Sequence, residues 1–196
     1  MRTYAEQRLI KAAFAAERRT DDPTRHKCFL CYRAGDADEV TTFVEDFGDV
    51  FIPRVIGVSD DDPFVDSSDT DYVLDCIREE YLTDSTVTIV MVGRCTWARK
   101  YVDWEVYSSL RNDKNNKRSG LMAITLPSVA DYDDRRLPNR VADNVDGKVG
   151  YARWWKYPKS KDGLRSHIAE AFTARSTKTD LIENSRARKL SNSNCS

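Results

Sequence analysis

One run of residues constrains the fold of this chain more than any other feature of its sequence. Residues 86–93 (TVTIVMVG) are almost all apolar or β-branched, and the run ends at a glycine. A strand without polar alternation has both faces covered, which is typical of a central strand in a parallel sheet. Residues 120–126 form a second such run, which ends before Pro127. Together the two runs predict an α/β protein with helices on both faces of the sheet.

The other predicted elements alternate between strand and helix. Pro53 interrupts the second strand, so we expect that strand to be short or to lie at an edge. Alternation of this kind predicts a parallel sheet whose ligands bind at the carboxyl ends of the strands. Strands are expected at 27–32, 50–58, 86–93, 120–126 and 149–157, and helices at 2–19, around 40–47, 70–82 and 104–110, and at 163–174.

The length of 196 residues suits one main domain. We expect this domain at 25–175, after an N-terminal helical extension at 1–24. The extension either packs on the main domain or serves as an oligomerisation element. A polar, basic tail at 176–196 carries few apolar residues after Ile182, so we expect it to be disordered.

Charge and hydropathy exclude several classes of partner. The 31 Lys and Arg residues nearly balance the 32 Asp and Glu residues, and the net charge is −1. Broad binding to nucleic acid needs a strong positive field, so no nucleic-acid partner is expected. No apolar run approaches the roughly 20 residues of a membrane span, and the first residues do not resemble a secretory signal. The sequence therefore predicts a cytoplasmic protein without a membrane partner.

The five cysteines are expected to be free thiols. Cys28 and Cys31 have the C-x-x-C spacing of some metal and redox sites, but they lie in a predicted strand. Side chains three apart in a strand point to opposite faces, and no second Cys or His pair with ligand spacing follows. No metal site is predicted, and the thiols are expected to be buried or reduced.

Several common active-site motifs are missing from the sequence. It contains no G-x-x-x-x-G-K-[ST] phosphate loop, no G-x-G-x-x-G after the first strand and no G-x-S-x-G elbow. The central strand ends in Val92-Gly93-Arg94, so the phosphorylatable aspartate of a receiver domain is also missing.

The segment that follows the central strand carries the remaining candidate chemistry. Glu105 lies four residues after Tyr101, so both side chains fall on one face of the predicted helix. An aromatic ring beside a carboxylate raises the carboxylate's pKa by desolvation and forms a wall for a flat ligand. The alternative is an exposed ion pair between Glu105 and Arg99 or Lys100.

Two motifs resemble those of Toll/interleukin-1 receptor (TIR) domains. Residues 28–33 (CFLCYR) resemble the first-strand motif F-I-S-Y-R, with Cys31 in place of the serine. Residues 101–105 (YVDWE) resemble W-C-x-x-E, with Tyr101 for the tryptophan and Val102 for the cysteine. Within that superfamily, residues 84–93 and 96–105 are most similar to the TIR-like ThsB proteins of the Thoeris anti-phage system. The resemblance covers about residues 27–127.

The resemblance implies a three-layer, flavodoxin-like fold with a central five-stranded parallel sheet and, outside it, the extra N-terminal helix. It also implies cleavage of the nicotinamide–ribose bond of NAD+, which is a substrate here, so no cofactor is expected. Glu105 would be the catalytic carboxylate, because positive charge develops on the ribose as nicotinamide leaves. Tyr101 would be the neighbouring aromatic wall. Tyr32 and Arg33 would bind substrate, with Arg33 facing the diphosphate.

Two further aromatic residues are candidates for substrate binding. Phe64 lies in a loop rich in aspartate and either stacks on adenine or anchors that loop. Trp97 either closes the pocket or packs on the preceding strand.

The resemblance leaves three functions open. The first is an enzyme that makes a cyclic ADP-ribose-type signal, which activates a partner effector during infection. The second is a non-enzymatic TIR module that self-associates, for which the departures at Cys31, Tyr101 and Val102 argue. The third is a hydrolase of nucleotides that lack nicotinamide. In the first two cases a homo-oligomer is a possible partner.

Overall fold

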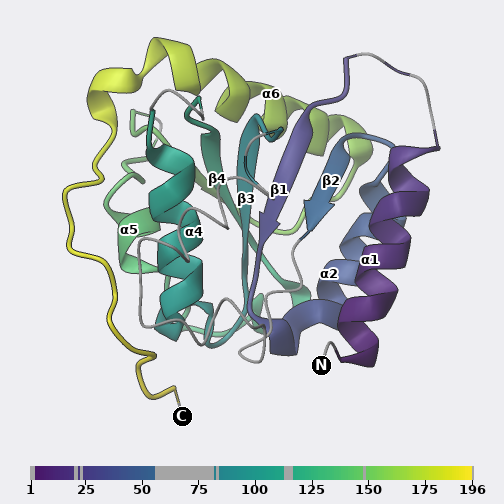
Figure 1. Ribbon diagram of the computed structural model, residues 1–196, viewed down its shortest axis with the longest axis horizontal. Coiled ribbons are helices and arrows are strands. Elements are labelled where there is room, and N and C mark those ends of the chain that lie inside the picture. The colour runs from purple at the N-terminus through teal and green to yellow at the C-terminus, as the bar shows by residue number, and fades with distance from the viewer. Residues whose placement is uncertain are drawn as a thin grey trace.

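A single parallel sheet lies at the centre of the molecule (Figure 1). The computed structural model describes residues 3–19, 22, 24–55, 82, 84–112, 117–147 and 149–195. Within them the strand order is β2-β1-β3-β4-β5, and every neighbouring pair is parallel. This confirms the predicted sheet and places the strand that contains Pro53 at an edge. The strands are β1 (Lys27–Cys31), β2 (Ile52–Val55), β3 (Val87–Val92), β4 (Gly120–Thr125) and β5 (Arg153–Trp155).

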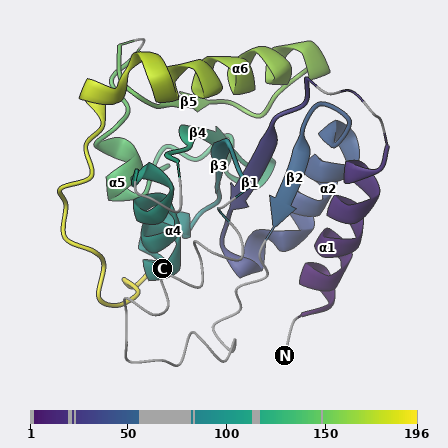
Figure 2. The same cartoon turned by 45° about the horizontal axis from the view of Figure 1, so that its top comes forward.

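Helices cover both faces of the sheet, so the fold has three layers (Figures 1 and 2). On one face, α4 (Lys100–Leu110) and α5 (Asn139–Ala142) pack against a core that contains Phe29, Val90 and Leu121. On the other face, α2 (Ala37–Phe47) and α6 (Lys161–Thr177) pack against a second core that contains Leu30, Ile89 and Met122. Strand residues alternate between the two cores, as strand geometry requires. The predicted α/β, flavodoxin-like architecture is therefore confirmed.

The predicted N-terminal helix is present as α1 (Tyr4–Glu17). Thr3 and Glu6 form a capping box, in which the Thr3 hydroxyl accepts from the Glu6 backbone N–H and the Glu6 carboxylate accepts from the Thr3 backbone N–H. The buried stripe is Leu9, Ala13 and Ala16, and it packs against α2 and β2. The helix thus contributes to the second core.

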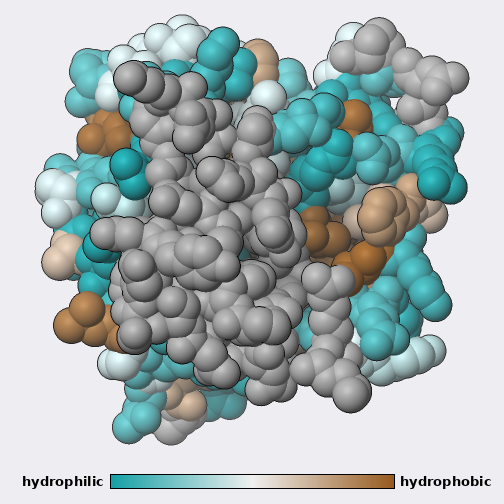
Figure 3. Space-filling view, viewed as in Figure 1, coloured by the Kyte–Doolittle hydropathy of each residue, from teal (hydrophilic) through white to brown (hydrophobic). Residues whose placement is uncertain are grey.

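The side of α1 next to its buried stripe leaves apolar surface beside the edge strand. Phe14 is 61% exposed. Together with Ile10, Pro53 and Val55 it borders a shallow hollow of about 220 Å³. Figure 3 shows apolar side chains gathered in this region, over α1 and β2. Phe14 therefore lies outside the buried stripe formed by Leu9, Ala13 and Ala16.

The polar tail is ordered, which corrects the predicted disorder after Ser176. Helix α6 continues to Thr177, and a 3-10 turn follows at Thr179–Leu181. We call residues 182–195 the strap, because they run along the outside of α5 and α4 (yellow in Figures 1 and 2). The strap is held by polar contacts rather than by an apolar face, which hydropathy patterning does not detect.

The cysteines follow the prediction only in part. Cys28 and Cys31 are free, buried and divided between the two cores, as their spacing in a strand predicted. Cys95 and Cys195, however, form a disulfide across a sequence separation of 100, so the expectation of five free thiols is wrong for this pair. The strap brings Cys195 back to the end of the central strand.

Two predicted features, the helix around 70–82 and the aspartate-rich loop before it, lie outside the described residues. Within the described ranges, no helix combines the length and the apolar character that a membrane crossing needs.

Candidate functional site

A hollow of about 150 Å³ opens at the carboxyl end of β1, where the resemblance placed the substrate. Its described lining comes from two segments that are far apart in sequence. The first follows β1, and the second is the start of α4. Three predicted site residues therefore meet in one place. The lining residues are Tyr32, Arg33, Ala34, Gly35, Arg99, Tyr101 and Val102.

Two glycines at this end of the sheet have polar side chains packed directly against their backbone. A Cβ atom on Gly35 would lie 3.0 Å from Cζ of Arg33, whose guanidinium folds over the glycine. A Cβ atom on Gly93 would lie 2.4 Å from Oδ2 of Asp36. Gly93 thus ends β3 where the Asp36 carboxylate packs directly on the backbone.

Asp36 is a partly buried acidic residue, with 11% of its side chain exposed, that the sequence did not single out. Burial raises the pKa of its carboxyl, while Arg33, with Nη1 3.7 Å from Oδ1, opposes the rise. The Thr96 hydroxyl lies 3.4 Å from Oδ2 and accepts a 2.9 Å hydrogen bond from the Gly93 N–H. Asp36 therefore orients Arg33 and joins the loop after β1 to the loop after β3.

Arg99 is a second residue of the site that the sequence analysis did not predict. The sequence suggested it only as an ion-pair partner of Glu105. In the structure it lines the hollow, and among the described residues its buried Nε has no hydrogen-bond partner. Arg33 and Arg99 thus both border the hollow, and planar guanidinium groups suit an anionic ligand such as a diphosphate. The pair of basic residues directly before Tyr101, Arg99 and Lys100, was a sequence signal that pointed to Arg99.

Glu105 lies one helical turn beyond Tyr101 and is only 6% exposed. Burial raises the pKa of Glu105 to about 8, although a hydrogen bond with the Cys31 thiol opposes the rise. Its Oε2 has no hydrogen-bond partner among the described residues. The alternative of an exposed ion pair with Arg99 or Lys100 is therefore wrong, because the carboxyl is buried against β1.

Glu105 does not itself border the hollow. Tyr101 and Val102, from the preceding turn of α4, form the wall at this point. Cys31, at the end of β1, lies behind that wall, with its Sγ 3.8 Å from the Val102 carbonyl oxygen. The Glu105 carboxyl is thus buried next to the hollow and does not line it.

The raised pKa of Glu105 predicts a specific dependence of stability on pH. Between the ordinary value of 4.5 and about 8, the unfolded state loses this proton while the folded state keeps it. The free energy of unfolding should therefore fall as pH rises, by about 1.4 kcal/mol per pH unit from this group. Urea unfolding of wild type and Glu105→Gln at pH 5, 6 and 7 measures the effect. The stability of Glu105→Gln relative to wild type should increase with pH, and a difference that stays constant would contradict the assigned burial.

Trp97 does not lie in the hollow. It belongs to the 3-10 turn Thr96–Ala98 and faces the strap, where its ring meets the Lys189 ammonium and the Arg136 guanidinium at 5.7 and 5.2 Å. Its carbonyl also accepts a hydrogen bond from Lys189 Nζ. Phe64, the other aromatic candidate, lies outside the described residues.

No cluster of His, Cys, Asp and Glu side chains that could hold a metal ion occurs in the described ranges. The candidate site consists of one buried carboxyl, two tyrosines and two arginines at the carboxyl end of a parallel sheet. The five-stranded parallel sheet with this site at its carboxyl end is consistent with a TIR-like domain of the flavodoxin-like class.

Comparison with known families narrows this class. The family model for the TIR-like domain of the Thoeris protein ThsB matches residues 29–131, just over half of the chain. The protein belongs to this family of anti-phage defence proteins. No curated protein and no solved structure matches the chain.

Proposed function

We propose that this protein cleaves the nicotinamide–ribose bond of NAD+ during phage infection. The product would be a cyclic ADP-ribose-type signal that activates a partner effector. The observation that carries the proposal is the buried Glu105 carboxyl beside a hollow lined by Tyr32, Arg33 and Tyr101. Membership of the Thoeris family supports the defence role.

The proposed reaction breaks the bond between the ribose C1′ and the pyridinium nitrogen. The bonding electron pair leaves with nicotinamide, and positive charge develops on the ribose. A carboxylate close to that charge lowers the barrier, most strongly where water is excluded. An adenine nitrogen or a hydroxyl of the adenosine ribose then attacks C1′ to close the cyclic product and releases a proton, whereas attack by water gives linear ADP-ribose.

The protonation state of Glu105 fits this scheme. At neutral pH a carboxyl with a pKa of about 8 is mostly protonated in the resting protein. The positively charged nicotinamide ring of NAD+ would lower that pKa when it binds nearby, because an opposite charge favours the carboxylate. Substrate binding would thus generate the charge that the transition state needs.

The arginines and tyrosines of the hollow have roles that follow from their chemistry. Arg33 and Arg99 would hold the diphosphate, since guanidinium groups donate paired hydrogen bonds to phosphate oxygens. Tyr32 and Tyr101 would stack against the flat rings of the substrate. For the ribose to reach Glu105, the side chains of Tyr101 and Val102 must turn aside while the helix stays in place, which suits an enzyme that is silent until infection triggers it.

The test is product formation in cells. Cells that express wild type should release nicotinamide and accumulate an ADP-ribose product when challenged with phage, and should form little of either without challenge, both measured by mass spectrometry. Challenged cells that express Glu105→Gln should form neither. Challenged cells in which folded wild-type protein forms no product would contradict the proposal.

A second candidate function is a non-enzymatic interaction module. The specific observation that favours it is the wall between Glu105 and the hollow, together with the departures from the TIR motifs at Cys31, Tyr101 and Val102. This function predicts that defence persists in Glu105→Gln and is lost through surface substitutions. The same cell experiment separates the two candidates.

A further inference from the structure

The strap contacts the outer side of α4 along most of the helix. At the start of α4, Asn192 Oδ1 accepts a 2.9 Å hydrogen bond from the Lys100 N–H, which no side chain within the helix caps. Just before the helix, the Ser193 N–H donates to the Ala98 carbonyl at 2.8 Å. Farther along, the Trp104 indole N–H donates to the Lys189 carbonyl at 2.8 Å. The strap therefore supplies hydrogen-bond partners that α4 lacks on its own.

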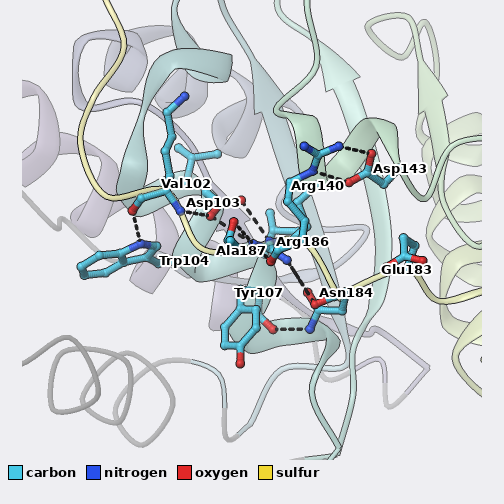
Figure 4. A network of polar contacts seen from close by, with 12 residues as sticks. Val102, Asp103, Trp104, Tyr107, Arg140, Asp143, Glu183, Asn184, Arg186 and Ala187 are labelled. Atoms are coloured by element: carbon cyan, nitrogen blue, oxygen red, sulfur yellow. Dashed lines mark hydrogen bonds and ion pairs between the residues drawn. The ribbon is translucent and has the colours of Figure 1, made fainter.

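Arg140 of α5 joins the strap to α4 (Figure 4). Its side chain is fully buried, and it binds the Asp103 carboxylate through Nε at 2.9 Å and Nη2 at 3.2 Å. The same guanidinium donates to Asn184 Oδ1 and to the Arg186 carbonyl, both at 2.9 Å. Asp103 also accepts from the Lys189 N–H at 2.9 Å. One buried ion pair thus holds α5, α4 and the strap together.

Asp103 lies on the side of α4 opposite the candidate site. It is two residues from Tyr101 and two from Glu105, which corresponds to a rotation of about 200° around the helix. Tyr101 and Glu105 therefore face the sheet and the hollow, while Asp103 faces Arg140 and the strap. The helix is clamped between them, because α4 also contacts β1 and β4.

From this geometry we propose that the strap, anchored by Arg140 and Asp103, is a positioning element for Glu105. It presses α4 against β1, so that the Glu105 carboxyl stays dry beside Cys31 and next to the hollow. Arg140 and Asp103 would then be positioning residues that act through α4 rather than through contact with substrate. The consequence for catalysis rests on the proposed function, but the placement of Glu105 does not.

The test loosens the strap in the full-length protein and follows the titration of Glu105. One variant, Asn184→Ala/Asn192→Ala, removes two strap side chains and leaves both cores untouched. The other, Asp103→Asn/Arg140→Met, removes both charges of the anchor and so leaves no buried charge unpaired. Carboxyl-labelled glutamate, observed by carbon NMR and assigned by comparison with Glu105→Gln, reports the pKa of Glu105. We expect the pKa to fall by at least about one unit in each folded variant, because the carboxyl gains water.

The matched control is Arg186→Ala, which breaks an ion pair between the strap and Asp143 of the α5 C-cap without touching α4. It should leave the Glu105 titration unchanged. Folded strap variants with wild-type titration would overturn the inference, and so would an equal shift in the control.

Activity supplies a second readout that separates the inference from the proposed function. If wild type cleaves NAD+, the strap variants should lose about tenfold in kcat with little change in KM, because an interaction with the transition state is misplaced. A shifted titration without any NAD+ cleavage by wild type would support the strap and contradict the enzyme. A rise in kcat would overturn the positioning role.

Discussion

Glu105→Gln is expected to lower the rate of nicotinamide release by about a hundredfold to a thousandfold, and to leave the fold intact. The amide has nearly the shape of the protonated carboxyl, so burial at 6% exposure is no obstacle to folding. It cannot take a negative charge, however, and loss of one preorganised electrostatic group costs about 10²–10³ in rate. Product formation measured by mass spectrometry, together with circular dichroism of the purified variant, checks both parts.

A glutamate outside the site serves as the control that shows whether the loss of activity is specific to Glu105. Glu45 is exposed on α2, away from the hollow, so Glu45→Gln should retain wild-type activity. If Glu105→Gln keeps most of the activity, Glu105 does not stabilise the transition state and the proposed mechanism fails. If both variants are equally impaired, the effect is not local to the site.

Arg140→Met is expected to destabilise the protein by about 3–5 kcal/mol, the largest loss of stability that we predict for one substitution. The arginine is fully buried and donates to Asp103 and to three strap residues, Asn184, Arg186 and Ala187. Removal leaves the Asp103 carboxylate buried with an uncompensated charge, which costs more than the ion pair contributes. Urea unfolding at neutral pH measures the change.

Two comparisons test the physical reason for this loss. Asp103→Leu/Arg140→Met removes both charges and should recover most of the stability that Arg140→Met loses. Arg165→Met breaks an exposed pair with Asp162 and should change stability by less than about 1 kcal/mol. A double variant that is no more stable than Arg140→Met would show that lost packing, rather than the unpaired charge, causes the effect.

The fold was predictable because its core follows hydrophobic periodicity. The continuous run in β3 predicted a central strand, and Pro53 predicted the edge position of β2. The opposite orientation of Cys28 and Cys31 followed from their spacing alone. Each of these predictions depends on a local rule that the chain obeys whatever its distant neighbours are.

The candidate site was predictable only to the extent that motifs mark it. The motifs led to Tyr32, Arg33 and Tyr101, which meet in the hollow, and to Glu105, which lies just behind it. They did not lead to Asp36 or Arg99, because Asp36 meets Thr96, and Arg99 meets the segment after β1, only in the folded protein. Trp97 was expected to close the pocket or to pack on the preceding strand, yet it faces the strap.

The sequence by itself determined the order of the strands and helices and the carboxyl end of the sheet as the place for a ligand. Periodicity and strand composition are local properties, and they are sufficient for both. Only the tertiary structure decided that the polar segment after α6 is ordered, that Cys195 returns to Cys95, and that Glu105 is dry. The strap contacts α5 through a buried arginine that donates to backbone carbonyls more than forty residues away, and such contacts leave no pattern in hydropathy.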